Sequence, residues 1–167
     1  MTSRPEPNVR DVMRHEFPVA SLETSIGELA RLMVEHQVPG LPVISGGELV
    51  GIVTEADLIQ REANVDMPSV VTILDAVIVA DAGTPFEEEL RRVVATTAEE
   101  LMTSPVISIR DTATVSELAT LMLQQRINPI PVVDNARQIV GLATRSGLVD
   151  VIARLEAISL SDDSGAK

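Results

Sequence analysis

Apolar and polar positions in the first third of the chain predict one strand followed by an amphipathic helix. Residues 17–20 form a short apolar run that is typical of a strand. Apolar side chains then recur every three or four positions from Ile26 to Met33, as on one face of a helix. Ser25 and Glu28 stand three residues apart in the capping-box pattern. We therefore expect a helix that begins just after Ser25.

Two further apolar runs predict a β-hairpin that leads into a second helix. Residues 41–44 and 49–53 are separated by Ser-Gly-Gly-Glu, in which the Gly46-Gly47 pair fits a two-residue hairpin turn. Thr54 follows the second run and is a suitable N-cap. The unit is thus predicted to run strand, helix, strand, strand, helix.

The same order of elements returns in the second half of the chain. Leu101-Met102 corresponds to Val12-Met13, residues 114–117 to 25–28, 118–122 to 29–33, and 130–132 to 41–43, all 89 positions apart. Gly141 and Thr144 correspond to Gly51 and Thr54 at 90 positions, because the second hairpin turn is one residue longer. So long a register indicates a duplicated unit.

Two units of about 50 residues are each too small to bury their own sheet and helix faces well. We expect an α+β fold in which they pack about a pseudo-two-fold axis, with a cleft where the two strand-to-helix corners meet. The chain is predicted to divide into a flexible leader at 1–8, a first repeat at 9–62, an insertion at 63–97, a second repeat at 98–156 and a disordered tail at 157–167.

The insertion is too long for a simple linker. Residues 70–79 are apolar enough to be buried, as either a helix or a strand. Pro85 and the acidic residues after it favour a helix that starts near Thr84. We favour two short helices, which would cover one side of the paired core or contribute to a dimer contact.

Composition narrows the classes of function. The formal net charge of −12 at pH 7 and the lack of a basic stripe argue against nucleic-acid binding, which depends on neutralising phosphates. No apolar run is long enough to cross a membrane, and the polar start lacks the apolar region of a signal peptide, so a cytoplasmic protein is expected. Aromatic residues make up 1% of the chain, so a bound base would lie against aliphatic side chains.

Residue types also limit the chemistry. With no cysteine, the chain has no disulfide and no thiolate nucleophile. His15 and His36 are the two histidines, and neither has further ligands at metal-binding spacing, so no metal site is expected. His36 stands near a helix C-terminus, where it is expected to interact with the helix dipole.

The strand-to-helix corner of the first repeat carries the candidate chemistry. Gly51 allows close approach of the backbone, and Thr54 and Asp57 stand three residues apart at the start of a helix. A hydroxyl donor with free helix-terminal N–H groups suits an anion, and a carboxylate suits the paired hydroxyls of a ribose. The alternative is purely structural, with Asp57 reaching back to the helix start in a capping box.

With these motifs, the chain resembles a tandem pair of cystathionine-β-synthase (CBS) domains, often called a Bateman module. The resemblance rests on the doubled pattern of a Met, an apolar-Pro-Val strand and a Gly-to-Thr corner, over about residues 9–62 and 98–156. It implies two β-α-β-β-α CBS repeats that bind an adenosyl ligand, such as AMP, ADP, ATP or S-adenosylmethionine. It also implies a homodimer.

The resemblance assigns site residues to the complete motif at 51–57. Thr54 would hold a phosphate or a nearby ribose oxygen, and Asp57 would accept hydrogen bonds from the two ribose hydroxyls. The adenine would lie against Val19, Ala20, Val38, Leu41 and Ile52, with backbone groups near residues 19–20 and at Pro39 and Gly40 reading its edge, while Pro42 fixes the entry of that strand.

The second motif departs from the pattern, because Gly147 stands where the ribose-binding acid is expected. Glycine supplies no acceptor, so we expect one competent site and one weak or empty site. Phosphates also need a cation near the acidic first corner. Arg145 at the second corner is the best candidate, and Thr144 beside it is a further candidate phosphate contact. The alternative for Arg145 is a solvated side chain at a helix start. Arg126 and His15 are weaker candidates.

We consider three functions for this sequence. The first is a regulatory sensor, in which an adenosyl ligand bridges the two repeats and shifts their packing, and the change passes to a separate protein or to self-association. The second is an interaction module that dimerises or docks without a ligand. The third, an enzyme, is disfavoured, because the sequence contains no nucleophile–base pair, metal constellation or P-loop.

Overall fold

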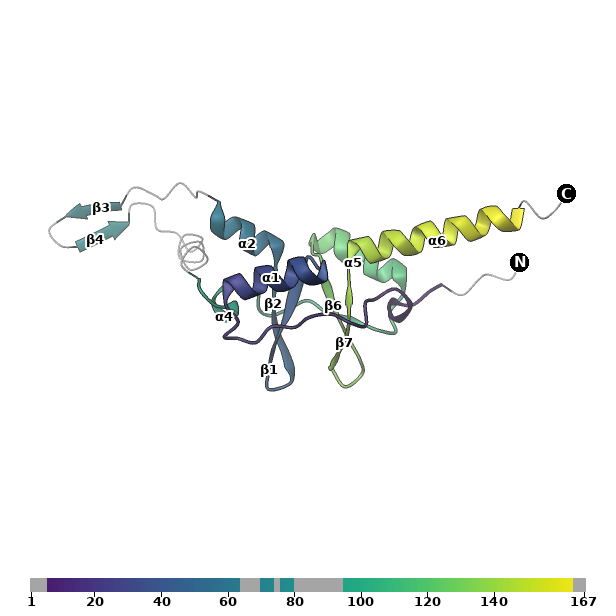
Figure 1. The fold of residues 1–167 in the computed structure, drawn as a ribbon, viewed down its shortest axis with the longest axis horizontal. Coiled ribbons are helices and arrows are strands. Elements are labelled where there is room, and N and C mark those ends of the chain that lie inside the picture. The colour runs from purple at the N-terminus through teal and green to yellow at the C-terminus, as the bar shows by residue number, and fades with distance from the viewer. Residues whose placement is uncertain (1–5, 64–69, 74–75, 80–94, 164–167) are drawn as a thin grey trace.

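The computed structural model describes the backbone of residues 6–63, 70–73, 76–79 and 95–163, and the side chains of 6–63 and 95–154. It is an α+β fold with two copies of one unit side by side (Figure 1). The first copy contains the 3₁₀ turn η1 (Val9–Asp11), α1 (Ile26–His36), β1 (Gly40–Ser45), β2 (Glu48–Thr54) and α2 (Glu55–Glu62). The second contains α4 (Ala98–Leu101), β5 (Ile109–Arg110), α5 (Val115–Gln125), β6 (Ile130–Val133), β7 (Ile139–Ala143) and α6 (Arg145–Asp163).

The two hairpins confirm the expected strands. β1 pairs with β2 antiparallel, and the turn residues Gly46 and Gly47 both have positive φ, of 57° and 84°. Glycine adopts this conformation at little cost, as a two-residue turn requires. β6 pairs with β7 in the same way, and β5 adds a short parallel strand to them. The strand expected at 17–20 was wrong, because only Ala20 pairs there, in a parallel bridge to Val43.

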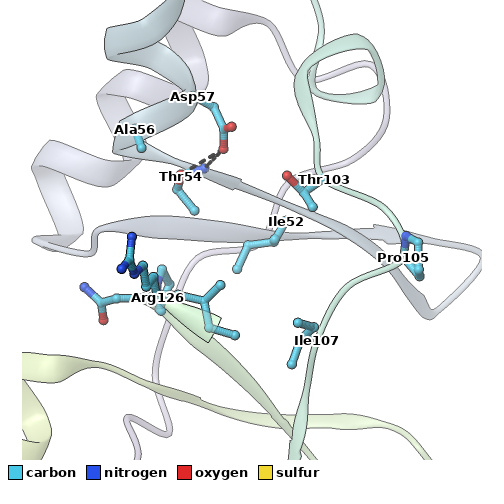
Figure 2. A pocket seen from close by; sticks show the side chains of 11 residues that line it. Ile52, Thr54, Ala56, Asp57, Thr103, Pro105, Ile107 and Arg126 are labelled. Atoms are coloured by element: carbon cyan, nitrogen blue, oxygen red, sulfur yellow. Dashed lines mark hydrogen bonds between the residues drawn. The ribbon is translucent and has the colours of Figure 1, made fainter. Parts of the chain in front are cut away.

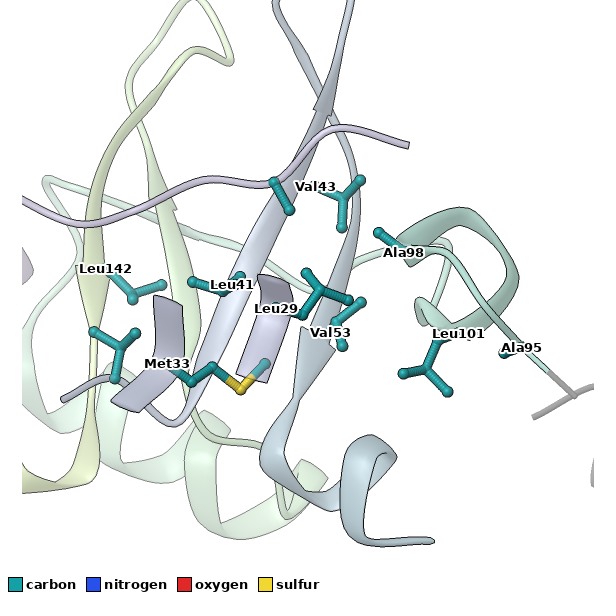
Figure 3. Packing of buried hydrophobic residues seen from close by; sticks show 11 residues of the cluster. Leu29, Met33, Leu41, Val43, Val53, Ala95, Ala98, Leu101 and Leu142 are labelled. Atoms are coloured by element: carbon teal, nitrogen blue, oxygen red, sulfur yellow. The ribbon is translucent and has the colours of Figure 1, made fainter. Parts of the chain in front are cut away.

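The two copies exchange the segments that precede their first helices. Val9 and Met13, from the start of the chain, are buried in the cluster that contains Leu118 and Ile130 of the second copy. In the same way, α4 of the second copy completes the core of the first copy (Figure 3). That cluster consists of Ala20, Leu29, Met33, Val38, Leu41, Val43, Val53, Ala95, Ala98, Leu101 and Leu142. Neither core is complete without a segment from outside its own repeat.

Backbone bridges across the pair show the pseudo-two-fold relation. Ile52 and Thr103 exchange two backbone hydrogen bonds, with N to O distances of 3.2 and 2.9 Å. Arg14 and Leu142 exchange the equivalent two, at 2.9 and 3.0 Å. Each pair joins the second hairpin strand of one copy to the segment that leads into the other copy, so the segment exchange is symmetric.

The insertion differs from our expectation in the part that the structure describes. Residues 70–79 contain two strands, β3 (Val70–Ile73) and β4 (Ala76–Val79), which pair antiparallel, so a helix here was wrong. Valine, isoleucine and threonine dominate these strands, and their branched side chains favour a pleated conformation. Figure 1 shows this hairpin apart from the two repeats, and the helix expected from Thr84 lies outside the described residues.

Both ends of the chain are more ordered than expected within the described residues. Glu6 and Pro7, predicted to be part of a flexible leader, bind the start of α5: the Val115 N–H donates to the Pro7 carbonyl at 3.0 Å, and the Ser116 N–H donates to the Glu6 carboxylate at 3.0 Å. The unpaired N–H groups of a helix start favour such partners. The hydrogen bonds from Ser116 hold the pKa of Glu6 below its ordinary value.

The tail prediction was also wrong in part, because α6 continues through residues 157–163. Once a helix has formed, each further residue that is fixed adds one hydrogen bond, and no proline interrupts this range. Residues 164–167 lie outside the described part of the chain.

Candidate functional site

The corner between β2 and α2 adopts the capping-box geometry that we weighed as its structural role. Thr54 has extended backbone angles, and both its backbone N–H and its hydroxyl donate to Oδ2 of Asp57 at 2.8 Å. Asp57 is buried. These bonds fix the orientation of the carboxylate at the start of α2. Both of these hydrogen bonds end on one of the two carboxylate oxygens of Asp57.

A cavity of about 230 Å³ opens beside this corner, and both copies line it (Figure 2). From the first copy come Ile52, Thr54, Ala56 and Asp57. From the second copy come Thr103, Pro105, Ile107, Arg126, Ile127, Asn128 and Pro129. Its walls are mainly apolar, with the carboxylate of Asp57 and the guanidinium of Arg126 as the charged groups among the lining residues. Such a cavity suits a ligand with an apolar body and a few polar groups.

The structure brings together only some of the residues predicted to form the site. Ile52, Thr54 and Asp57 line the cavity, whereas Ala20, Val38 and Leu41 belong to the hydrophobic core. Val19 is largely exposed and is not among the lining residues.

The backbone around β1 is used structurally rather than as part of this cavity. Pro39 accepts a hydrogen bond from the Glu55 N–H at 2.9 Å, and Pro42 accepts one from the Ala20 N–H at 2.9 Å. A Cβ on Gly40 would lie 2.8 Å from Cδ of Pro129, so these two residues meet where the copies join. None of the three lines the cavity beside Thr54.

Three of the lining residues that the sequence did not predict belong to the segment equivalent to residues 38–40, in the other copy. Ile127, Asn128 and Pro129 lie 89 positions after residues 38–40, which we had placed against the adenine. The repeat offset could have located them, because a corner that meets the axis faces the equivalent segment of the other copy. The choice between the two copies depends on the segment exchange, which the local sequence does not indicate.

The cation at the cavity is Arg126 rather than Arg145. Arg126 ends α5 with a positive φ of 55°, and its side chain lines the cavity. Arg145 is exposed at the start of α6, and its backbone N–H donates to Oδ1 of Asn128 at 2.9 Å. Neither Arg145 nor His15 is among the lining residues.

The second corner is arranged differently from the first. The Gly147 N–H donates to Oγ1 of Thr144 at 3.0 Å, and that oxygen also lies 3.0 Å from Oγ of Ser146. Thr144 is buried, so its hydroxyl is engaged within the protein. A Cβ on Gly147 would lie 3.2 Å from Oγ1 of Thr144 and 3.3 Å from the Val12 carbonyl oxygen, so a larger residue there requires its neighbours to move.

Among the residues that the structure describes, no three His, Cys, Asp or Glu side chains are grouped to hold a metal ion. Their helices also include none with the length and apolar character needed to span a membrane.

Comparison with known proteins fits this doubled architecture. The CBS domain model matches residues 9–64 and 98–154. The chain belongs to the CBS domain family. Its two CBS domains are the two copies described above, and their matched ranges include both strand-to-helix corners.

Similar CBS structures contain adenosyl compounds. The crystal structure of CBSX2 in complex with AMP is 26% identical, with a TM-score of 0.71, and the alignment covers 89% of this chain and 98% of that one. The CBS domain pair of protein MJ0100, in complex with 5′-methylthioadenosine and S-adenosyl-L-methionine, is 25% identical, with a TM-score of 0.65 and coverage of 87% and 99%.

Relatives by sequence include small proteins and enzymes. Uncharacterized protein MJ1426 of Methanocaldococcus jannaschii is 26% identical over 152 residues, which cover 86% of this chain and 90% of the relative. Homoserine O-acetyltransferase of Methanosphaerula palustris is 32% identical over 147 residues, but the match spans only 24% of that enzyme. The similarity to this enzyme is thus confined to a quarter of its length.

Proposed function

We propose that the CBS pair is a regulatory sensor that binds one adenosyl nucleotide per chain at the Thr54–Asp57 corner. The observation that carries this proposal is the cavity between the copies, which places a fixed carboxylate and a cation at an apolar surface. The structures of related CBS pairs with AMP, 5′-methylthioadenosine and S-adenosyl-L-methionine support an adenosyl ligand. We propose a regulatory role and no catalytic one.

Each part of the ligand has a matching surface in the cavity. The base would lie against aliphatic side chains such as Ile52, Ile107 and Ile127, because the lining residues include no aromatic ring. The ribose hydroxyls would donate to Asp57, as the capping bonds already orient its carboxylate. Arg126 would bind the phosphate, through charge-assisted hydrogen bonds that are stronger than neutral ones.

The position of Arg126 favours a phosphate-bearing nucleotide over S-adenosylmethionine, whose sulfonium carries a positive charge. In calorimetric titrations of AMP, ADP, ATP and S-adenosylmethionine, we expect saturable binding near one ligand per chain and a preference for the phosphates. Arg126→Ala should weaken AMP about tenfold, the equivalent of one charge-assisted hydrogen bond, and should leave adenosine unaffected.

Arg145→Ala is the matched control for this titration, because Arg145 is an exposed arginine that does not line the cavity. It should bind AMP like the wild type. Equal losses of AMP and adenosine in Arg126→Ala would contradict a phosphate contact. If no adenosyl ligand binds wild-type protein that is free of carried-over nucleotide, the sensor proposal fails.

The helices that meet the cavity provide a route for its output. α2 begins at the Thr54–Asp57 corner, Arg126 caps the C-terminal end of α5, and the Arg145 N–H at the start of α6 donates to Asn128. A ligand that favours one placement of these residues therefore favours one placement of the helices. Binding is coupled to any contact that the helices make, with equal effect in both directions.

Among the described residues, the four most exposed large apolar side chains lie on α1, α2, α5 and α6. Val34 of α1 and Leu123 of α5 are 79% and 75% exposed, and Ile59 of α2 and Val149 of α6 are 69% and 63% exposed. The four are equivalent in pairs, at offsets of 89 and 90 positions. Figure 1 shows α1, α2, α5 and α6 on one side of the two hairpins. We propose that this surface pairs with a second copy, which makes a homodimer.

Leu123→Glu combined with Ile59→Glu should convert the dimer to a monomer in sedimentation-velocity experiments, because paired apolar side chains would be replaced by repelling charges. Val19→Glu is the control, since Val19 is 46% exposed but lies outside these helices. A wild-type protein that is monomeric at all concentrations tested, with and without AMP, would exclude output through self-association and leave a separate regulated protein as the target.

One observation favours the alternative of a ligand-free interaction module. Asp57 is already engaged in capping α2, which gives this residue a role without any ligand. The same AMP titration separates the two functions, because an interaction module would dimerise without binding AMP.

A further inference from the structure

The two corners of the CBS pair differ in how their clefts are crossed. At the first corner, Thr103 and Arg126 line the cavity, and Figure 2 draws them on opposite sides of Ile52. Thr103 is the residue whose backbone pairs with Ile52. The side chain at position 103 is short, and Ile52 lines the cavity as its apolar floor.

At the second corner an arginine takes the position of Thr103. Arg14 pairs with Leu142 through the same two backbone hydrogen bonds. Gln37 takes the position of Arg126, because each is the left-handed residue that ends its helix, with φ of 52° and 55°. The same three positions therefore define the second cleft.

The Arg14 side chain joins the two walls of that cleft. Its Nη1 donates to the Gln37 carbonyl oxygen at 3.1 Å. The acceptor lies at the C-terminal end of α1, where the helix dipole favours a cation. Arg14 is half-buried, and the methylenes of a long arginine can cover apolar surface beneath its charged end.

The two equivalent floor residues differ in their surroundings. Leu142 is 0% exposed and belongs to the core cluster of the first copy. Ile52 is 8% exposed and lines the cavity.

We propose that Arg14 is a built-in occupant of the second cleft, which closes that cleft to adenosyl ligands. Two features then oppose ligand binding in the second cleft. Gly147 supplies no carboxylate, and the contact of Arg14 with Gln37 crosses the cleft. The closure itself can be tested without any ligand, whereas its consequence for binding rests on the proposed adenosyl site at the first corner.

Methyl NMR with a soluble nitroxide tests the closure. In wild-type protein, relaxation enhancement of the Leu142 methyl groups should be well below that of the Ile52 methyl groups. In Arg14→Thr, which copies Thr103, the enhancement at Leu142 should rise to that of Ile52. Arg145→Thr removes a nearby exposed charge and should change neither. Equal enhancement at both floors in the wild type, or no rise in Arg14→Thr, would overturn the proposal.

Titration of AMP tests the consequence in an Asp57→Ala background, where the first corner has lost its carboxylate. Adding Gly147→Asp alone should restore no binding, because Arg14 still crosses the cleft. Adding Gly147→Asp with Arg14→Thr should restore saturable binding near one AMP per chain. Restoration by Gly147→Asp alone would show that Arg14 is no obstacle. A folded triple variant that binds no AMP, beside a wild type that does, would also contradict the proposal, whereas a wild type without AMP binding counts against the sensor function instead.

Discussion

Asp57→Ala is expected to reduce AMP affinity roughly 100-fold or more in calorimetric titration. The two proposed ribose hydrogen bonds end on a charged acceptor, and each is worth about 1.5–3 kcal/mol. The substitution also removes the acceptor of the Thr54 N–H and hydroxyl, so the protein should lose about 1 kcal/mol of stability. Titration and thermal unfolding of the same sample measure the two effects.

Glu117→Ala separates the loss of a helix cap from the loss of a ligand contact. Glu117 closes a capping box of the same kind at the start of α5, where its Oε2 accepts from the Thr114 N–H at 2.7 Å and from the Thr114 hydroxyl at 3.2 Å. It does not line the cavity beside Thr54. Its replacement should lower stability by a similar amount and leave AMP affinity unchanged. If the two variants lose AMP affinity equally, Asp57 acts through stability and not through contact.

The sequence repeat made the two-copy architecture predictable, but it did not indicate that the copies exchange segments. Equivalent caps, proline-valine strands and glycine corners in one register required two similar units, and similar units with open faces pack together. The register is the same whether Val9–Met13 packs on its own copy or on the other. The structure shows the second arrangement, which completes each core from outside its repeat.

Part of the candidate site could likewise be predicted from the local sequence, and part depends on tertiary packing. Thr54 and Asp57 could be chosen from sequence, because a hydroxyl and a carboxylate three residues apart at a helix start share one face. The opposite wall of the cavity could not be predicted in this way, because residues 103–107 and 126–129 reach the corner only through tertiary packing. Arg14 shows the same limit, as nothing in its local sequence indicates that its side chain meets the end of α1.

The asymmetry of the CBS pair follows from a few substitutions on a symmetric frame. The backbone bridges at Ile52 and Leu142 are alike, yet a threonine stands beside one and an arginine beside the other. An aspartate ends one motif and a glycine ends the other. Divergence after duplication can thus leave one cleft for a ligand and use the other as fixed support, without altering the fold.

Gly51→Ala is expected to lower the free energy of unfolding by about 1–3 kcal/mol, the usual cost of overpacking. A Cβ on Gly51 would lie 2.3 Å from Sδ of Met102, 2.9 Å from its Cγ and 3.1 Å from its Cβ, so the whole side chain must move. Chemical denaturation measures this loss. Gly27→Ala in α1, where a Cβ would meet nothing within 4 Å, should instead add up to about 1 kcal/mol.

A second glycine provides the control that links this packing to ligand binding. A Cβ on Gly141 would lie 2.2 Å from Sδ of Met13, so Gly141→Ala should destabilise the protein as Gly51→Ala does. Met102 precedes Thr103 at the cavity, whereas Met13 precedes Arg14 at the closed cleft. Displacement of Met102 should therefore weaken AMP binding as well, and displacement of Met13 should not. Met102→Ala should relieve part of the cost of Gly51→Ala in a double-mutant cycle. Strictly additive losses would show that the Gly51 contact with Met102 does not set the packing.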